Sequence, residues 1–326
     1  MADEERDRVA LTNLDQALFD GAEATKRDLV DYLDAVADRI LPELAGRPLS
    51  VIRVLRGQPP FMQKNLPKYT PDWVHRVAVW SEASKREISY ALCDDRRTLL
   101  WFANQRAIEY HPTLYRAAEG WDHPTQLVLD IDPPEGGGFA VVVAAAHLVR
   151  TALTDCGLAG AVKTSGSKGV HVVVPITGAG GEEVAAATRA LAARAERLDP
   201  ALATTAFVRE ERHGKVFLDA TRAGGATVVA AYSPRVRPGA PVSFPLTWDE
   251  LDGADPHAFT LHTVPPLLAD RPTWADLLPE PQPLPAEVVE EGRAIPVARV
   301  QAMHAGKRRA RARREAAEEG AAPPGG

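Results

Sequence analysis

Cysteine, long apolar runs and surplus positive charge are all scarce in this sequence of 326 residues. Its two cysteines, Cys93 and Cys156, cannot form a disulfide framework and suit a reducing compartment. The longest apolar run, Phe139–Ala146, is far shorter than the roughly 20 residues that span a membrane. The first residues, MADEERDR, lack the basic and apolar regions of a signal peptide. We therefore expect a soluble intracellular protein.

Charge is distributed unevenly along the chain. The net charge is −6 at pH 7 and the sequence pI is about 5.9, so nucleic-acid binding would require a local basic surface. Residues 307–314 carry six Lys and Arg, within a segment (297–326) that has no apolar face beyond alanine. This segment is typical of a solvated, disordered tail, and it is also compatible with an electrostatic arm that touches nucleic acid.

Hydrophobic periodicity predicts that helices and strands alternate. Thr25 can cap an amphipathic helix over 26–44. With 45% hydrophobic residues, the chain can bury a full core in one large domain or two. The other expected elements are helices at 139–154, 182–198 and from 247, strands at 49–55, 127–132, 161–164, 170–176, 215–221 and 226–233, and strands or short helices at 74–80, 87–93 and 98–104.

Two aspartates lie close together on a strand that is otherwise apolar. In LVLDIDPPEGGG (127–138), Asp130 and Asp132 precede a turn rich in Pro and Gly. Side chains at i and i+2 of a strand point to the same face, with Cα atoms roughly 6–7 Å apart. Two carboxylates this close repel each other unless a cation lies between them, and a divalent metal ion is the simplest such cation. The alternative is that one Asp merely starts the turn, as Asp before Pro often does.

A third acidic residue, Asp219, ends another apolar strand in GKVFLDATR. Alone it is an ordinary strand-end residue, but beside Asp130 and Asp132 in one sheet it would complete a site of oxygen ligands. Mg²⁺ and Mn²⁺ favour carboxylate oxygens, and two such ions about 3.5–4 Å apart are usual in phosphoryl and nucleotidyl transfer.

The segment KTSGSKGVH (163–171) offers the groups that bind triphosphate oxygens: hydroxyls, a lysine, backbone amides around glycines, and a histidine. It is not a Walker loop, because the order of residues differs and a strand rather than a helix follows. The alternative is an ordinary glycine hairpin with a surface lysine. His171 by itself is more often a hydrogen-bonded strand residue than a ligand.

Arginines form a third cluster, at Arg222 and at Arg235 and Arg237 in AYSPRVRPG. Arginine forks match phosphate in bidentate fashion. Arginines in a proline-rich loop are commonly just solvated, so this cluster gains meaning only from its neighbours.

Taken in order, LDIDPPEG, KTSGSKGVHVVVP, GKVFLDATR and YSPRVRPGAPVSFPLTWDEL resemble the motifs of archaeo-eukaryotic primase-polymerases. More narrowly, they resemble the polymerase domain of bacterial ATP-dependent DNA ligases of non-homologous end joining, and its stand-alone relatives. The resemblance runs from about residue 9 to 280. It implies an α/β primase-polymerase fold, in which two β-sheet modules, one like an RNA-recognition motif (RRM), flank a catalytic cleft with surrounding helices. We assign 1–296 to this catalytic domain and 297–326 to the tail.

The resemblance also implies roles for individual residues. Three carboxylates would hold two metal ions, Mn²⁺ or Mg²⁺: Asp130, Asp132 and Asp219. Six residues would bind the incoming nucleotide: Arg53, His111, Ser165, Lys168, His171 and Arg235. Four residues would contact the 5′-phosphate across a gap or the template: Asn13, Lys26, Phe61 and Lys64.

The sequence departs from the family's pattern at three of the implied contacts. Ile52 stands where a lysine is common, so one cation of the nucleotide pocket is absent. Met62 replaces a second phenylalanine, which halves an aromatic platform worth about 1–3 kcal/mol per stacked base. Gln16 replaces a frequent lysine, which weakens recognition of the 5′-phosphate.

The resemblance implies template-directed nucleotidyl transfer from an NTP or dNTP to a 3′-hydroxyl, in gap filling or end processing, with a preference for ribonucleotides. We expect no attached ligase or nuclease domain, so that a separate ATP-dependent ligase and Ku would be partners on gapped or broken DNA. We expect a bacterial cytoplasmic protein at the nucleoid, away from the membrane.

Two other classes of function stay open. The first is a DNA-end-binding accessory protein of end joining with a vestigial pocket, which would bind gapped DNA but add no nucleotide. The second is a metal-dependent nuclease or phosphatase. The hairpin at 163–171 and Arg235 argue against hydrolysis, because hydrolysis needs no site for a triphosphate.

Overall fold

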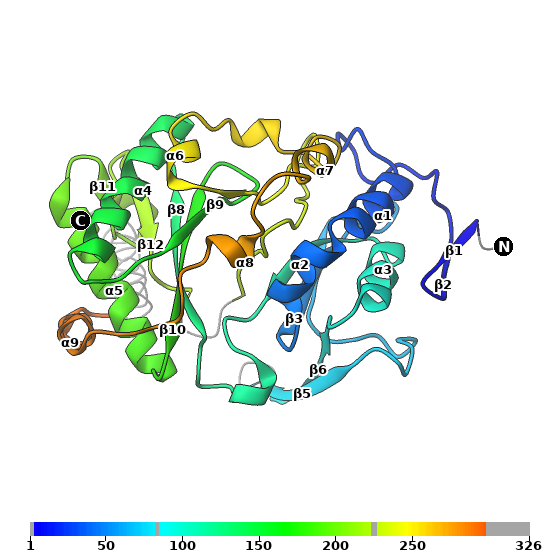
Figure 1. The fold of residues 1–326 in the computed structure, drawn as a ribbon, viewed down its shortest axis with the longest axis horizontal. Helices are drawn as coiled ribbons and strands as arrows, with labels where there is room; N and C mark the ends of the chain where they lie inside the picture. The colour runs from blue at the N-terminus through cyan, green and yellow to red at the C-terminus, as the bar shows by residue number, and fades with distance from the viewer. Residues whose placement is uncertain (1–2, 82–84, 223–226, 298–326) are drawn as a thin grey trace, which may run out of the picture.

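The computed structural model describes residues 3–81, 85–222 and 227–297, which fold into two β-sheet modules side by side (Figure 1). The N-terminal module contains α1–α3, and the C-terminal module contains α4, α5 and the longest strands. The basic tail predicted at 297–326 lies, apart from Val297, outside the described residues.

In the N-terminal module, strands follow the order β4-β3-β6-β5, and β7 pairs with β3. Helices α1 and α3 pack against each other, and α3 also contacts β7. The strands span Glu4–Arg6 (β1), Val9–Leu11 (β2), Pro48–Arg53 (β3), Phe61–Gln63 (β4), Arg76–Ser81 (β5), Arg86–Leu92 (β6) and Ala107–Pro112 (β7). The helices span Lys26–Ala35 (α1), Ala37–Leu44 (α2) and Arg96–Asn104 (α3), with a 3₁₀ turn at Ala117–Glu119.

The C-terminal module has the βαββαβ order of an RRM, because β8, α4, β9, β10, α5 and β12 follow one another and the strands pair in the order β12-β8-β10-β9. Helices α4 and α5 pack together on one face of this sheet. The predicted RRM-like module is confirmed. Its elements span Gln126–Asp132 (β8), Phe139–Thr154 (α4), Ala161–Thr164 (β9), Val170–Thr177 (β10), Gly181–Leu198 (α5), Ala203–Thr204 (β11) and Val216–Asp219 (β12).

Short elements complete the C-terminal part of the chain. Pro245–Leu246 (β13) and Gln282–Pro283 (β14) extend the sheet at β9 and β10. Helix α9 packs on α5. The remaining elements are Trp248–Leu251 (α6), Val264–Leu267 (α7), Trp274–Leu277 (α8), Ala286–Ala294 (α9) and 3₁₀ turns at Arg209–Glu211 and Pro256–Ala258.

Two local predictions need correction. Thr25 does cap a helix, through a capping box with Asp28, but the predicted helix 26–44 breaks at Val36, whose backbone (φ −99°, ψ 5°) leaves the helical region. The predicted strand 226–233 is not a strand over its described residues, 227–233. There the chain crosses between the modules, and single backbone amides donate hydrogen bonds to β7, as Ala230 N does to Tyr110 O (2.9 Å).

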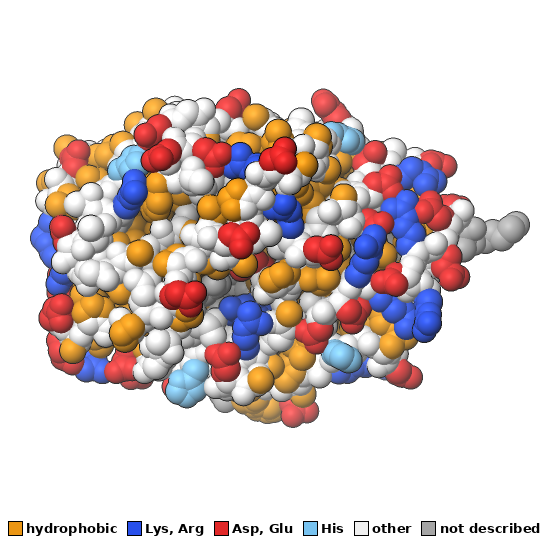
Figure 2. Space-filling model, viewed as in Figure 1, with side chains coloured by type: hydrophobic (Ala, Val, Ile, Leu, Met, Phe, Trp, Pro, Cys, Tyr) orange, Lys and Arg blue, Asp and Glu red, His pale blue; other side chains and the backbone are white. Residues whose placement is uncertain are grey.

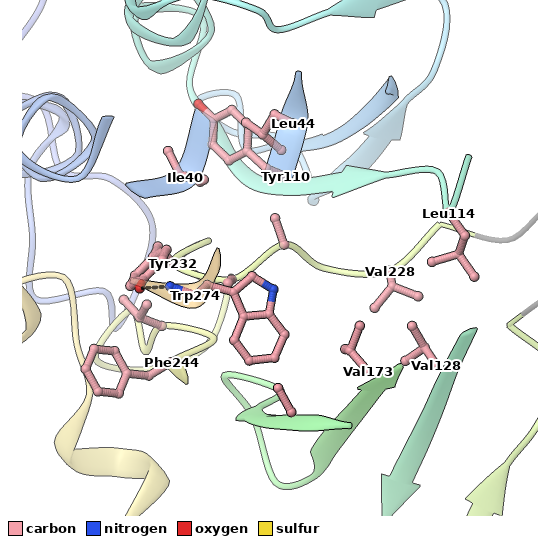
Figure 3. Packing of buried hydrophobic residues seen from close by; sticks show 14 of the residues in the cluster. Ile40, Leu44, Tyr110, Leu114, Val128, Val173, Val228, Tyr232, Phe244 and Trp274 are labelled. Atoms are coloured by element: carbon pink, nitrogen blue, oxygen red, sulfur yellow. Dashed lines mark hydrogen bonds between the residues drawn. The ribbon is translucent and has the colours of Figure 1, made fainter. Parts of the chain in front are cut away.

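An apolar core joins the two modules (Figure 3). Ile40 and Tyr110 approach it from the N-terminal module and Val173 from the C-terminal sheet, with Trp274 of α8 between them. The amide of Trp274 donates a hydrogen bond to the hydroxyl of Tyr232 (3.0 Å). Because these side chains are almost fully buried, separating the modules would expose a large apolar area, and their relative position is therefore fixed.

Among the described residues, no helix combines the length and the apolar composition needed to cross a bilayer. On the face shown in Figure 2, acidic and basic side chains are intermixed, most densely over the N-terminal helices. Ion pairs such as Arg6–Asp34 (3.3 Å) and Arg96–Asp34 (2.6 Å) account for part of this pattern.

Candidate active site

Four polar side chains lie side by side across the C-terminal sheet. Asp219 of β12 is directly opposite Asp130 of β8, which is opposite His171 of β10, which is opposite Lys163 of β9. Residues in register on neighbouring strands point to the same face, so these four form one line, which we call the cross-strand row. Asp132, two residues beyond Asp130, points to the same face.

This face opens on a cleft of about 1060 Å³ between the modules. The N-terminal module contributes Met62, Lys64 and His111 to its wall. The cleft therefore brings together most of the residues singled out in the sequence. Its polar and charged lining includes Lys64, His111, Asp130, Asp132, Ser165, Lys168, His171, Arg209, Arg212, Lys215, Arg222, Arg235 and Arg237.

Asp130 is buried and held from two sides. Nε2 of His171 lies 3.3 Å from Oδ1 of Asp130, and the guanidinium of Arg222 donates two hydrogen bonds to Oδ2 (2.8 and 3.2 Å). Burial raises the pKa of Asp130, but His171 and Arg222 outweigh burial and hold it below its usual range. Burial lowers the pKa of His171 to about 4, helped by the charge of Lys163, so its ring is neutral at pH 7.

The pKa of Asp132 is shifted in the opposite direction from that of Asp130. Burial, together with the charges of Asp130 and Asp219, raises the pKa of Asp132 to about 6. Asp219 is held by its own turn, since its Oδ1 accepts hydrogen bonds from the amide and hydroxyl of Thr221 (2.8 and 2.6 Å). The two carboxylates of β8 thus differ, since Arg222 and His171 stabilise the charge of Asp130, whereas Asp132 faces two like charges.

The donor set fits a hard divalent cation, because it consists of carboxylate oxygens. The described residues contain no ready-made group of three or more His, Cys, Asp and Glu side chains that could hold a metal ion. The guanidinium of Arg222 lies 2.8 Å from Asp130 and 3.4 Å from Asp219. A cation already stands between two of the predicted ligands, so Arg222 must release a carboxylate before a metal ion can share them.

The loop between β9 and β10 packs closely against neighbouring backbone and side chains. The hydroxyl of Ser165 accepts hydrogen bonds from the amides of Gly169 (3.1 Å) and Ser167 (3.3 Å). Gly166 has φ +67°, and a Cβ there would lie 2.6 Å from Cγ of Arg235. A Cβ at Gly169 would lie 2.4 Å from the backbone oxygen of Ile131. Both glycines are therefore needed for this loop, which carries exposed Lys168, to pack against β8 and against the loop of Arg235 and Arg237, which we call the arginine loop.

Glu109, which the sequence interpretation did not single out, connects two predicted nucleotide contacts. Its Oε2 lies 2.8 Å from Nε2 of His111 and 3.0 Å from Nε of Arg235, and its Oε1 accepts from the amide of Val236 (2.8 Å). The Arg235 contact is an ion pair, since the Nε–H is not aimed for a hydrogen bond. Burial raises the pKa of Glu109, but His111 and Arg235 outweigh it and lower the pKa to about 2. Arg235 also donates to the backbone oxygen of Ser165.

Other predicted contacts lie at the edge of the cleft or outside it. Met62 is exposed on β4, and Lys64 follows it. Arg53 is buried behind them, where it donates to Gln63 Oε1 (2.7 Å) and lies 5.9 Å from the ring centre of Phe61. Neither Arg53 nor Phe61 is among the residues that line the cleft.

The two predicted 5′-phosphate contacts also lie apart from the cleft. Asn13 is exposed at a left-handed turn (φ +54°). Lys26 is 3% exposed, and its Nζ donates to Thr12 O (2.5 Å) and Asn104 Oδ1 (2.6 Å). Burial, with the nearby charge of Arg106, lowers the pKa of Lys26 to about 8.

A second cavity, of about 790 Å³, lies beside the N-terminal segment. Gln16, Arg56, Arg106 and Arg237 line it, and Arg237 also lines the cleft. Nη1 of Arg106 is buried and has no hydrogen-bond partner among the described residues. Arginines therefore line both the cleft and the second cavity, and Arg237 is common to the two.

Sequence interpretation missed several residues of the site. Arg222 was noticed only as one of a basic cluster, and Glu109 and Lys163 were given no role. A charged residue inside an apolar strand, such as Lys163 in AVKT or Glu109 in AIEYHP, is the signal that could have found them. Arg212 stacks on Phe217 (3.6 Å to the ring centre), a contact that joins two elements and has no sequence signature.

An RRM-like sheet with carboxylates on its open face, next to a lysine- and arginine-lined cleft, defines a polymerase-type nucleotidyltransferase. The model of one family, the LigD primase-polymerase domain, matches residues 25–274. The chain belongs to this family, whose members are DNA-directed nucleotidyltransferases. The predicted family is confirmed.

Known relatives agree with this assignment. The multifunctional non-homologous end joining protein LigD of Mycolicibacterium smegmatis is 33% identical over 318 residues, which is 89% of this chain and 41% of the relative. The bifunctional non-homologous end joining protein LigD of Bacillus subtilis is 33% identical over 263 residues, 79% of this chain and 42% of the relative. The chain thus spans about two fifths of these relatives' length.

Among solved structures, the chain is similar to the polymerase domain from Mycobacterium tuberculosis Ligase D in complex with DNA, with a TM-score of 0.74 and 35% identity. The match covers 81% of this chain and 95% of that one.

Proposed function

We propose that this chain transfers nucleotides from an NTP or dNTP to the 3′-hydroxyl of DNA, directed by a template and with release of pyrophosphate. The observation that carries the proposal is the cross-strand row. It places Asp219, Asp130 and His171 on one face of the sheet, and Asp130 and His171 line a cleft that the cationic groups Lys168 and Arg235 also line. Hydrolysis of a phosphodiester would need the carboxylates but not a site for a triphosphate.

In this mechanism, Asp130, Asp132 and Asp219 hold divalent ions, Mn²⁺ or Mg²⁺. Such ions lower the pKa of an attacking hydroxyl and neutralise a triphosphate. The chain's own groups supply position and charge, as phosphoryl transfer generally requires. Lys168 and Arg235 bind the phosphates together with Ser165 and His171, which line the same cleft. Glu109 keeps Arg235 and His111 in place.

We propose that gapped or broken DNA with a 5′-phosphate is the substrate. The solved relative with DNA supports this, as does the arginine-lined second cavity, which Arg237 links to the cleft. Asn13 and Lys26 remain our proposed 5′-phosphate contacts. Phe61 and Lys64, with exposed Met62 between them, remain our proposed template contacts. Arg53, whose guanidinium lies 5.9 Å from the ring centre of Phe61, remains a proposed nucleotide contact.

The decisive experiment is primer extension on gapped, 5′-phosphorylated DNA with each NTP and with Mn²⁺ or Mg²⁺. We expect extension by the wild-type chain and none by Asp130→Ala or Asp132→Ala, whose circular dichroism should match the wild type. Asp249→Asn, which changes an exposed carboxylate of α6 away from the cleft, is the matched control and should extend normally. Extension by either alanine variant would refute the metal assignment, and loss of labelled termini instead of lengthening would indicate a nuclease.

We further propose a preference for ribonucleotides, which rests on family resemblance. Competition between an rNTP and the matching dNTP on one gapped template tests it directly. Equal incorporation would reject the preference.

The relatives' names support a role in non-homologous end joining. We propose that the chain acts there with an ATP-dependent ligase and Ku, in the bacterial cytoplasm at the nucleoid. Co-purification of the full chain with Ku on DNA ends, compared with DNA of the same sequence in closed circles, tests the partnership.

A further inference from the structure

Lys163 is a charged side chain of the cross-strand row to which the proposed mechanism gives no task. It is 2% exposed and lies on β9 directly opposite His171. Buried lysines are rare unless they are paired, because the charged form loses its hydration. Burial lowers the pKa of Lys163 to about 7, so at pH 6 the side chain is mostly an ammonium.

The surroundings of Nζ account for each of its protons. Nζ of Lys163 lies 2.9 Å from Nδ1 of His171, 2.7 Å from Oγ of Ser243 and 3.0 Å from the backbone oxygen of Val229. The Ser243 hydroxyl donates its own proton to Thr164 O (2.7 Å), so it can only accept from Lys163. A carbonyl oxygen also only accepts. The three N–H groups of an ammonium therefore meet three acceptors, and the third of these is Nδ1 of His171.

This arrangement determines which nitrogen of His171 carries a proton. When Nδ1 accepts a hydrogen bond, the proton of the neutral ring is on Nε2. Nε2 is the atom that faces Oδ1 of Asp130, at 3.3 Å. The ring therefore presents a donor to the carboxylate.

We propose that Lys163 is a positioning residue that fixes the Nε2-protonated tautomer of His171, and through it the orientation of the Asp130 carboxylate. Charged groups face Lys163 from several elements: Glu43 on α2, Asp130 on β8 and Arg235 in its loop. None of them is one of its three hydrogen-bond partners. Space filling alone would be served as well by an apolar side chain of similar length, which would leave Nδ1 of His171, the oxygen of Val229 and the hydroxyl of Ser243 without this donor.

The first test uses the metal-free wild-type protein. Long-range ¹H–¹⁵N correlation spectra of the histidine rings, recorded at pH 6, report the tautomer, and His171→Gln identifies the signal. We expect His171 to carry its proton on Nε2. A proton on Nδ1 would overturn the inference.

The second test is Lys163→Met, with Thr188→Val as the control. Thr188 is a buried residue of α5 whose hydroxyl donates to Val184 O (2.6 Å), so its loss removes a buried polar group elsewhere. We expect Lys163→Met to lose the pure Nε2 tautomer and to lower kcat of extension about 10-fold or more, with KM for the nucleotide within about 3-fold. Thr188→Val should keep the Nε2 tautomer of His171 and the wild-type kcat and KM. An unchanged tautomer in Lys163→Met would overturn the inference.

The kinetic arm rests on the proposed function, whereas the spectra do not. If the wild-type chain shows the Nε2 tautomer but no extension, the proposed function fails and the positioning role stands. If extension occurs but His171 carries its proton on Nδ1, the positioning role fails and the proposed function stands.

Discussion

Buried Glu109 and half-buried Arg235 form an ion pair, 3.0 Å between Oε2 and Nε, that ties the N-terminal module to the loop of Arg235. The same carboxylate contacts His111 at 2.8 Å, and Arg235 in turn donates to Ser165 in the β9–β10 loop. One residue of β7 thus orients groups on both sides of the cleft. The nucleotide-binding side of the site depends on how the modules are packed.

Glu109→Gln should weaken nucleotide binding. The amide keeps the size of the side chain but removes the charge that holds Arg235, so we expect KM for the nucleotide to rise about 10-fold or more, equivalent to about 1.4 kcal/mol. The measurement is steady-state extension with varied NTP. Glu287→Gln on α9, an exposed position, should leave KM unchanged. A KM equal to wild type would show that Glu109 does not position Arg235.

Asp132→Asn should stabilise the metal-free protein while abolishing extension. The folded-state pKa of Asp132, about 6, lies above its ordinary value of 3.8, so ionisation favours the unfolded chain. The resulting loss of stability is absent below pH 3.8, grows as the pH rises towards 6, and is complete above it. We expect the variant to gain about 1–2 kcal/mol at pH 7, after allowance for partial exposure, and nothing below pH 3.8.

Urea unfolding in the presence of EDTA, at pH 7 and below pH 3.8, measures the difference in stability between Asp132→Asn and the wild type. Mn²⁺ should then stabilise the wild type more than Asp132→Asn, because the ion binds the folded state and relieves the same repulsion. Equal stabilisation of the two proteins would count against Asp132 as a metal ligand.

Met62→Phe should tighten the binding of gapped DNA. Met62 is 45% exposed at the cleft, next to Phe61, so an added ring has room to stack on a base. Stacking is worth about 1–3 kcal/mol per base, and we expect a 5-fold or larger gain in affinity by fluorescence anisotropy. Met62→Leu, which adds no ring, controls for side-chain volume and should bind as the wild type does. If Met62→Phe binds gapped DNA no more tightly than the wild type, the template does not stack at this position.

Removal of residues 298–326 should reduce the salt dependence of DNA binding. These residues include the six Lys and Arg of 307–314, and each phosphate contact contributes about −0.9 to the slope of log K against log salt concentration. Binding isotherms of the full and shortened chains between 50 and 200 mM salt make the comparison. Identical slopes would mean that the tail is not an electrostatic arm.

Much of the fold followed from local pattern. Helix α4 begins and ends where its apolar run predicts, and Thr25 caps α1 as expected. The failures lie where tertiary contacts override local preference. Residues 227–233 are apolar enough for a strand, but they bridge the modules through single bonds such as Ala230 N to Tyr110 O. The break at Val36 lets Ile40 of α2 reach the core between the modules.

The sequence by itself determined the chemistry of this protein, because motif order and residue type are local properties: paired carboxylates on a strand, a glycine loop with a lysine, and arginines after prolines. Only the tertiary structure decided how these groups are charged and partnered. Cross-strand register places Asp219 opposite Asp130, the Arg222 guanidinium fills the space between them, and Lys163 meets His171. Those relations join residues far apart in the chain, and burial, which no local pattern reports, sets the strength of their interactions.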